Sequence, residues 1–268
     1  MSDDLALYEV TDRVAVVTLN RPERLNAWTD KLAVAYFDRL DEAVADPRVG
    51  AIVVTGAGRG FCPGADMADL QGLSSEDGGG RGRRGPARPT TYPMSVPKLM
   101  VAAINGACAG LGLVQALLCD VRIAAAGAKF TTAFARRGLI AEHGISWVLP
   151  RIVGTASALD LLTSGRVFTA EEAAALGVVN RVVPPDQVLA EAIEYARDVA
   201  ANCSPASVAA IKDQLRRHIS MEFDAACADS DRLMARSLRG PDFREGVSSY
   251  IEKRPPEFAP LGQGTILD

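Results

Sequence analysis

Two glycine-containing turns are the segments of this chain best suited to chemistry. Residues 61–67 read FCPGADM and residues 104–112 read INGACAGLG. Glycines let a backbone approach a ligand closely, and N–H groups in the first turn of a helix attract negative charge. Two such turns facing each other would direct two N–H donors at one oxygen on which negative charge develops. Taken singly, each turn is better explained as an ordinary connection from a strand to a helix.

Strands and helices alternate around these turns. Apolar runs predict buried strands over 51–55 and 99–104, directly before the two turns. A further strand is predicted over 14–19, and Thr29 is placed to cap a helix that ends before Pro47. Strands that alternate with helices are typical of parallel βα units, so we expect an α/β fold.

Helices dominate the chain beyond residue 170. Thr169 and Glu172 have the spacing of a capping box, and Ser204 precedes a proline at the start of another helix. Further amphipathic helices are predicted over 186–201, 221–238 and 242–253. We therefore expect a core over residues 1–200 and a helical region over 201–268.

Residues 74–92 differ from their surroundings. They are rich in glycine, proline and arginine, which predicts a mobile loop rather than a domain boundary, because the strand pattern resumes directly afterwards. The position after the first glycine turn suits a lid over a binding pocket. A solvated insertion without function is equally compatible with the pattern.

The composition excludes several classes of function. The 268 residues are 48% hydrophobic and 23% charged, which fits a globular chain with a sizeable core. A net charge of −4 gives no electrostatic basis for binding nucleic acid or an anionic membrane. No apolar run is long enough for a membrane span, and the acidic start MSDD is unlike a signal peptide.

Five cysteines without CxxC spacing indicate reduced thiols and a cytoplasmic location. Cys62 and Cys108 lie in the two turns, and we interpret both as small buried packing residues. The chain has two histidines and no cluster of His and Cys, so no metal site is expected.

Five segments together resemble the enoyl-CoA hydratase/isomerase (crotonase) superfamily. They are the two glycine turns, NRPERLNA at 20–27, CDVRIA at 119–124, and a closing helix over 245–254. They occur in the family's order along nearly the whole chain. The resemblance implies a crotonase-like spiral of ββα turns with a C-terminal helical region. It also implies that this region joins the subunits of a homotrimer or homohexamer.

The resemblance further implies a binding site for an acyl-CoA substrate. The backbone N–H groups of Ala65 and Leu111 would form an oxyanion hole for the thioester carbonyl. The positions that match contacts to coenzyme A are Arg24, Ala27, Ala65, Asp66, Met67, Tyr250 and Lys253. Arg24 and Lys253 are the charges expected at the CoA nucleotide, and Lys253 with Tyr250 matches a pair that often reaches a neighbouring subunit. A solvated surface charge is the competing interpretation of each. No cofactor beyond the coenzyme A moiety of the substrate is expected.

The acidic and basic side chains at the predicted active site decide which reaction an enzyme of this superfamily catalyses. Hydratases of this superfamily use two glutamates, one to activate water and one to deliver a proton. Counting without gaps places Val114 and Phe134 at those positions, and neither can carry a proton. Glu142, in GLIAEHG at 138–144, resembles the single catalytic carboxylate of some isomerases in the superfamily.

A single carboxylate suffices to move a double bond, because it can remove the proton alpha to the thioester and return it at the gamma carbon. We therefore predict an enoyl-CoA isomerase with Glu142 as its base; a helix-capping or surface role is the competing interpretation of Glu142. An enoyl-CoA hydratase of fatty-acid degradation and a catalytically silent acyl-CoA-binding protein stay open as alternatives. Asp66 and Asp69 are interpreted as helix caps, and His143 is expected to point away from Glu142 if the segment is helical.

Overall fold

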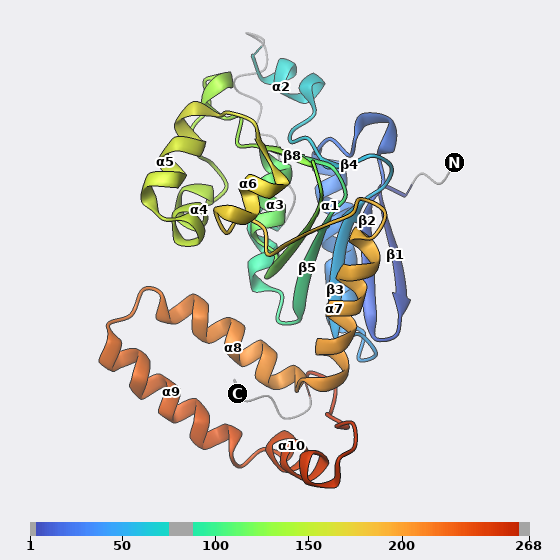
Figure 1. The fold of residues 1–268 in the computed structure, drawn as a ribbon, viewed down its shortest axis with the longest axis vertical. Coiled ribbons are helices and arrows are strands. Elements are labelled where there is room, and N and C mark those ends of the chain that lie inside the picture. The colour runs from blue at the N-terminus through green and yellow to red at the C-terminus, as the bar shows by residue number, and fades with distance from the viewer. Residues whose placement is uncertain (1–3, 75–87, 263–268) are drawn as a thin grey trace.

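A six-stranded sheet forms the centre of the molecule. The computed structural model describes residues 4–74 and 88–262 (Figure 1). The strands of this sheet are β1 (Ala6–Thr11), β2 (Val14–Leu19), β3 (Ala51–Gly56), β5 (Leu99–Ile104), β7 (Val121–Ala125) and β10 (Arg181–Val183), in that spatial order. β1 pairs with β2 in antiparallel fashion, and the other neighbours are parallel. The predicted strands β3 and β5 are buried along their whole length.

A smaller sheet lies beside the large one. Its strands are β4 (Gly60–Cys62), β6 (Ala107–Ala109), β8 (Lys129–Thr131) and β9 (Phe168–Thr169), also in spatial order. β3 continues into β4, β5 into β6 and β7 into β8, so each turn of the chain adds one strand to each sheet before a helix. This repetition confirms the predicted spiral of ββα turns.

Helices pack on the large sheet. α1 (Asp30–Ala45) begins where predicted, because the Thr29 hydroxyl accepts a hydrogen bond from the Leu32 N–H at 3.2 Å. α7 (Val188–Asn202) approaches the sheet closely through small residues: a Cβ at Gly50 would lie 2.7 Å from that of Ala200. The remaining elements of the core are η1 (Pro22–Arg24), α2 (Met67–Ser74), η2 (Tyr92–Ser95), α3 (Leu111–Leu117), η3 (Ala135–Arg137), α4 (Ile145–Val153), α5 (Thr155–Ser164) and α6 (Ala170–Ala175).

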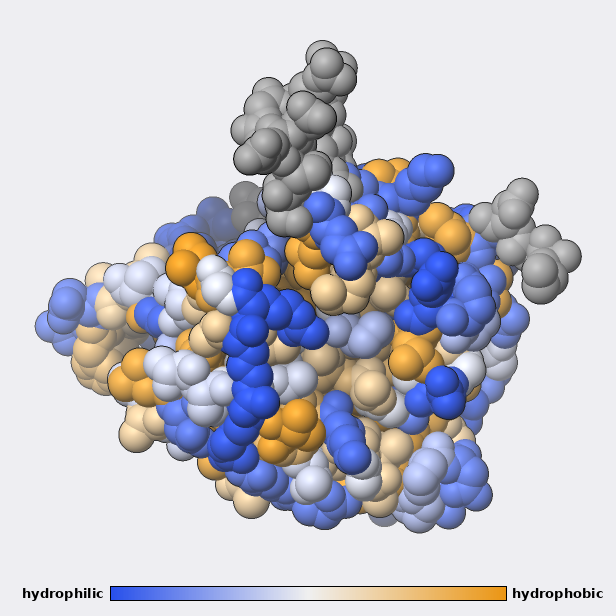
Figure 2. Space-filling view, turned by 90° about the horizontal axis from the view of Figure 1, so that it is seen from above, coloured by the Kyte–Doolittle hydropathy of each residue, from blue (hydrophilic) through white to orange (hydrophobic). Residues whose placement is uncertain are grey.

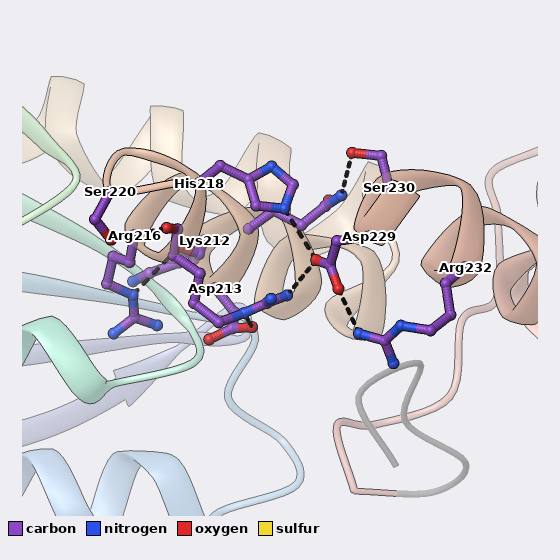
Figure 3. A network of polar contacts seen from close by, with 10 residues as sticks. Lys212, Asp213, Arg216, His218, Ser220, Asp229, Ser230 and Arg232 are labelled. Atoms are coloured by element: carbon purple, nitrogen blue, oxygen red, sulfur yellow. Dashed lines mark hydrogen bonds and ion pairs between the residues drawn. The ribbon is translucent and has the colours of Figure 1, made fainter. Parts of the chain in front are cut away.

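Three helices follow the core and form a separate layer, which Figure 1 shows at the end of the molecule away from α2. They are α8 (Pro205–His218), α9 (Phe223–Ser237) and α10 (Pro241–Glu252). Asp229 of α9 binds Arg217 at 2.8 Å and His218 at 2.9 Å, both from α8, and also contacts Arg232 (Figure 3). This cluster holds α8 and α9 side by side.

Most of the predicted loop over 74–92 falls on residues 75–87, which lie outside the described residues. After it, Arg88 pairs with Asp38 of α1 at 2.8 Å and also with Asp41, so the chain is attached to the core again at this point. None of the helices in residues 4–74 and 88–262 has both the length and the apolar character that crossing a bilayer requires.

Candidate active site

The two glycine turns meet at the edge of the small sheet. Gly64 has φ +99° and Gly110 has φ +48°, both conformations that favour glycine. A Cβ at Gly64 would lie 3.0 Å from the Ala109 carbonyl oxygen and 3.5 Å from the Leu111 nitrogen. Because β4 and β6 pair in parallel, their carboxyl ends lie together, and this brings the turns into contact.

Each turn presents one N–H group that the surrounding backbone does not use. Around Ala65, the Trp28 N–H donates to the Gly64 carbonyl at 2.8 Å, and the Asp66 N–H donates to the Trp28 carbonyl at 2.9 Å. Leu111 is the first residue of α3, where backbone donors have no partner within the helix. Within residues 4–74 and 88–262, neither the Ala65 nor the Leu111 N–H binds a backbone carbonyl.

A small cavity of about 40 Å³ joins these groups to the predicted base. Its lining includes Ala65, Leu111, Phe134 and Glu142, and among the described residues that line it Glu142 is the only carboxylate. A wider cleft of about 290 Å³ adjoins it and shares Ala65, Leu111 and Glu142. The structure therefore brings two backbone N–H groups and one carboxylate to the lining of one cavity, and their chemical roles stay predictions.

Glu142 lies in the connection between η3 and α4, and its side chain is 38% exposed. His143 has φ +56°, and its Nε2 lies 3.3 Å from Glu142 Oε1. The expectation that His143 points away from Glu142 was tied to a helix, and no helix is present here, because α4 begins only at Ile145.

Apolar residues occupy the two positions at which the ungapped count places the glutamates of a hydratase. Phe134 is 5% exposed and lines the cavity. Val114 is 1% exposed and lies one turn further along α3 from Leu111. Neither supplies a group that could activate a water molecule.

The opening motif fastens the first glycine turn to the core. The buried Asn26 side chain accepts from the Arg21 N–H at 2.8 Å and donates to the Gly60 carbonyl at 2.8 Å. Arg21 also pairs with Asp66 at 3.1 Å and donates to the Ala27 carbonyl at 2.5 Å. Sequence reasoning missed Arg21 and Asn26, although both belong to the motif NRPERLNA that identified the segment.

Asp66 caps α2, as predicted. Its carboxylate accepts from the Ala68 N–H at 3.1 Å and pairs with Arg21, and these contacts hold the pKa of Asp66 below its usual range. Arg24 is exposed on η1 and close enough to lower this pKa as well. Met67 follows, 53% exposed.

The predicted CoA positions fall into two groups. Arg24, Ala27 and residues 65–67 lie together at the end of the molecule that carries α2, where Figure 2 shows apolar patches among strongly hydrophilic side chains. Tyr250, which is 86% exposed, lies on α10 at the opposite end, and Lys253 directly follows this helix (Figure 1). One chain does not bring the two groups together.

Two backbone N–H groups and one carboxylate that line the same cavity can remove a proton from a bound molecule and stabilise the negative charge that develops on its oxygen. The chain belongs to the enoyl-CoA hydratase/isomerase family, whose sequence model matches residues 9–260. A probable enoyl-CoA hydratase from Rhodobacter capsulatus is 38% identical over 264 residues, which cover 96% of this chain and 99% of the relative. A 1,2-epoxyphenylacetyl-CoA isomerase from Escherichia coli is 34% identical, over 95% of this chain and 98% of the relative.

Solved structures agree with this assignment. A probable enoyl-CoA hydratase/isomerase from Mycobacterium abscessus has a TM-score of 0.86 at 31% identity, over 96% of this chain and 99% of its own. An enoyl-CoA hydratase from Mycobacterium marinum is 52% identical, with a TM-score of 0.69 over 80% of this chain and 97% of its own.

Proposed function

We propose that this enzyme moves the double bond of an enoyl-CoA, with Glu142 as the only proton carrier. The observation that carries the proposal is the small cavity, in which Glu142 is the only carboxylate among the described lining residues. Phe134 lines the same cavity where a second glutamate would serve hydration. The relative from Escherichia coli is also named as an isomerase, although its named substrate is an epoxide and not a 3-enoyl-CoA.

The reaction uses groups that this chain supplies. The Glu142 carboxylate removes a proton from the alpha carbon of a 3-enoyl-CoA, and the electron pair moves onto the thioester oxygen. The N–H groups of Ala65 and Leu111 stabilise the resulting dienolate oxygen. Glu142, now protonated, returns the proton to the gamma carbon, which leaves a conjugated 2-enoyl-CoA and the original carboxylate. No cofactor beyond the CoA moiety of the substrate takes part in these steps.

The test is to give the enzyme 3-enoyl-CoA and 2-enoyl-CoA thioesters separately. Absorbance of the conjugated product follows isomerisation of the first, and mass spectrometry detects water added to the second. We expect rapid conjugation of the first substrate and slow hydration of the second. Hydration as fast as isomerisation contradicts the proposal and favours the hydratase named among the relatives.

Coenzyme A binding requires a second subunit under this proposal. Arg24 and residues 65–67 would hold one end of the CoA moiety, and Tyr250 and Lys253 from a neighbouring subunit would hold the nucleotide. The observation that supports a second subunit is the separation of these two groups, which lie at opposite ends of one chain (Figure 1).

The C-terminal helices offer the surface for this assembly, which we propose is a homotrimer or homohexamer. Large apolar side chains are exposed along all three: Ile211, Leu215, Phe223, Met234, Phe243 and Ile251. Burying such side chains between subunits is favourable. The five cysteines, all free thiols, fit a reducing cytoplasm, where we place the enzyme.

A further inference from the structure

The turn that carries Glu142 has an unusual backbone. His143 has φ +56° and the next residue, Gly144, has φ +79°. A left-handed conformation is disfavoured for a residue with a Cβ, so the surrounding structure must hold His143 in it. The turn closes through a hydrogen bond of 3.2 Å from the Ile145 N–H to the Glu142 carbonyl.

This conformation places the imidazole against the carboxylate. His143 Nε2 lies 3.3 Å from Glu142 Oε1, with the two side chains 29% and 38% exposed. Both residues line the wider cleft, together with Ala65 and Leu111. The imidazole therefore contacts the proposed base from within the substrate-binding cleft.

We propose that His143 is a positioning residue for Glu142. This inference rests on the proposed function above. Its Nε2 holds Oε1 of the carboxylate, which leaves the other oxygen, Oε2, to exchange the proton with substrate carbon atoms. The base must reach both the alpha and the gamma carbon of the substrate. A contact at one carboxylate oxygen limits the side-chain rotamers of Glu142, so a larger fraction of enzyme molecules holds the other oxygen near these two carbons.

The charge of His143 should also affect the reaction. A positive charge on the imidazole would attract the carboxylate more strongly than a neutral ring does, because the two groups are in contact. Other charged groups lie nearby: Asp30 from α1 and Asp69 from α2 line the same cleft, and Arg137 from η3 lines the adjoining small cavity. Imidazole is the side chain that ordinarily changes charge between pH 5 and 8, and the chain has only two histidines.

The second histidine supplies a matched control. His218 pairs with Asp229 at 2.9 Å in the layer of C-terminal helices (Figure 3), away from the cleft. H218Q therefore removes an equivalent imidazole without touching Glu142.

The experiment measures kcat, KM and the pH dependence of kcat for isomerisation. In H143N, asparagine tolerates positive φ and keeps the turn, but its side chain ends short of Glu142. We expect H143N to lower kcat on the order of 10- to 100-fold with KM nearly unchanged, and to remove one ionisation from the acid side of the pH profile. H143Q, whose longer side chain carries an N–H donor, should recover much of kcat. H218Q should match wild type in kcat and in its pH dependence.

Several results overturn the inference. They are wild-type kcat in H143N, a loss confined to KM, an unchanged pH profile, or equal losses in H143N and H143Q. If H143N lowers the melting temperature, H143Q is compared with H143M instead. The methionine side chain has a similar length but no N–H donor. Equal kcat values for H143Q and H143M overturn the inference. E142Q separates the two proposals: an inactive E142Q beside a fully active H143N contradicts only the role of His143, whereas an active E142Q contradicts the proposed function itself.

Discussion

Backbone amides at Ala65 and Leu111 carry the proposed oxyanion hole, so their side chains can vary without removing a donor. The path of the backbone is what cannot vary. Gly64 combines φ +99° with a contact that would place a Cβ 3.0 Å from the Ala109 carbonyl oxygen. At the scale of the residue, then, glycine at this turn matters more than the identity of the residue that donates.

The cysteines provide a residue-scale test of the packing around these turns. Burial raises the pKa of the Cys62 thiol to about 12 and that of Cys108 above its usual range, and Cys119 is also buried. Because the thiolate is the reactive form, these three should resist alkylation in the folded protein, while Cys203 and Cys227 are exposed and should react. Peptide mass spectrometry after brief alkylation checks this, with denatured protein as the control. Alkylation of Cys62 or Cys108 in the folded protein would contradict the burial of these two side chains.

Sequence reasoning can bring residues to one place when a motif marks each of them, whereas their chemical roles stay predictions. The glycine turns and Glu142 were predicted because a motif marks each of them. The contact of His143 with Glu142 was not, since it depends on a positive φ that nothing in the residue type requires. Asn26 was missed for a similar reason: its side chain bonds to backbone at 57 and 60, far along the chain.

At the scale of elements, the position of α3 depends on its approach to β4. A Cβ at Gly112 would lie 2.1 Å from the Cys62 carbonyl oxygen, and backbone atoms cannot easily move away. We expect G112A to destabilise the fold by about 1–3 kcal/mol or more. Thermal unfolding followed by circular dichroism measures the loss.

Gly72 in α2 is the matched control for this substitution. Among residues 4–74 and 88–262, nothing lies within 4 Å of a Cβ at Gly72, and alanine is the better helix former. G72A should therefore leave the melting temperature unchanged or raise it. Equal melting temperatures for G112A and wild type would show that α3 does not lie against β4 as described.

The end of α10 carries an ion pair with a defined pH dependence. Arg254 binds Glu245 at 2.6 Å and, with the Glu257 N–H, lowers the pKa of Glu245 to about 2 from 4.5. A carboxylate with a depressed pKa stabilises the fold above its unfolded-state pKa, and this stabilisation disappears as the pH falls towards 2. E245Q should thus lower the melting temperature near neutral pH, by an amount that shrinks between about pH 4.5 and 2.

The exposed Glu9 of β1 offers the comparison, because E9Q makes the same chemical change elsewhere. A difference between E245Q and wild type that stays constant across this pH range would contradict the assigned ion pair.

Elements with clear end signals were the predictable ones. Thr29, Thr169 and Ser204 each cap the helix predicted to start there. The short strands β4, β6 and β8 were not predicted, because three residues carry too little hydrophobic pattern to identify a strand. They exist because each pairs with a neighbour contributed by another turn of the spiral.

At the scale of the whole molecule, α10 and the glycine turns lie at opposite ends of one chain. Both can contact the same CoA molecule only if subunits associate, so CoA affinity tests the proposed assembly. R24A and K253A should each weaken CoA binding by about 1 kcal/mol, roughly fivefold, and less at high salt. Calorimetry measures both, with R244A on α10 as a charge-matched control. Light scattering should give the mass of three or six chains. A monomeric mass, or unchanged affinity in both variants, contradicts the shared nucleotide site.

The measurement that tests the central claim most directly is isomerisation by E142Q. Glutamine keeps the shape of the side chain but cannot accept the alpha proton, and loss of a positioned base costs on the order of 10²–10⁴ in rate. The N–H groups of Ala65 and Leu111 still hold the carbonyl, so the loss should appear in kcat while KM changes little. Wild-type enzyme should also exchange alpha protons of a saturated acyl-CoA with deuterated water, and E142Q should not. Near wild-type isomerisation by E142Q would show that Glu142 is not the proton carrier.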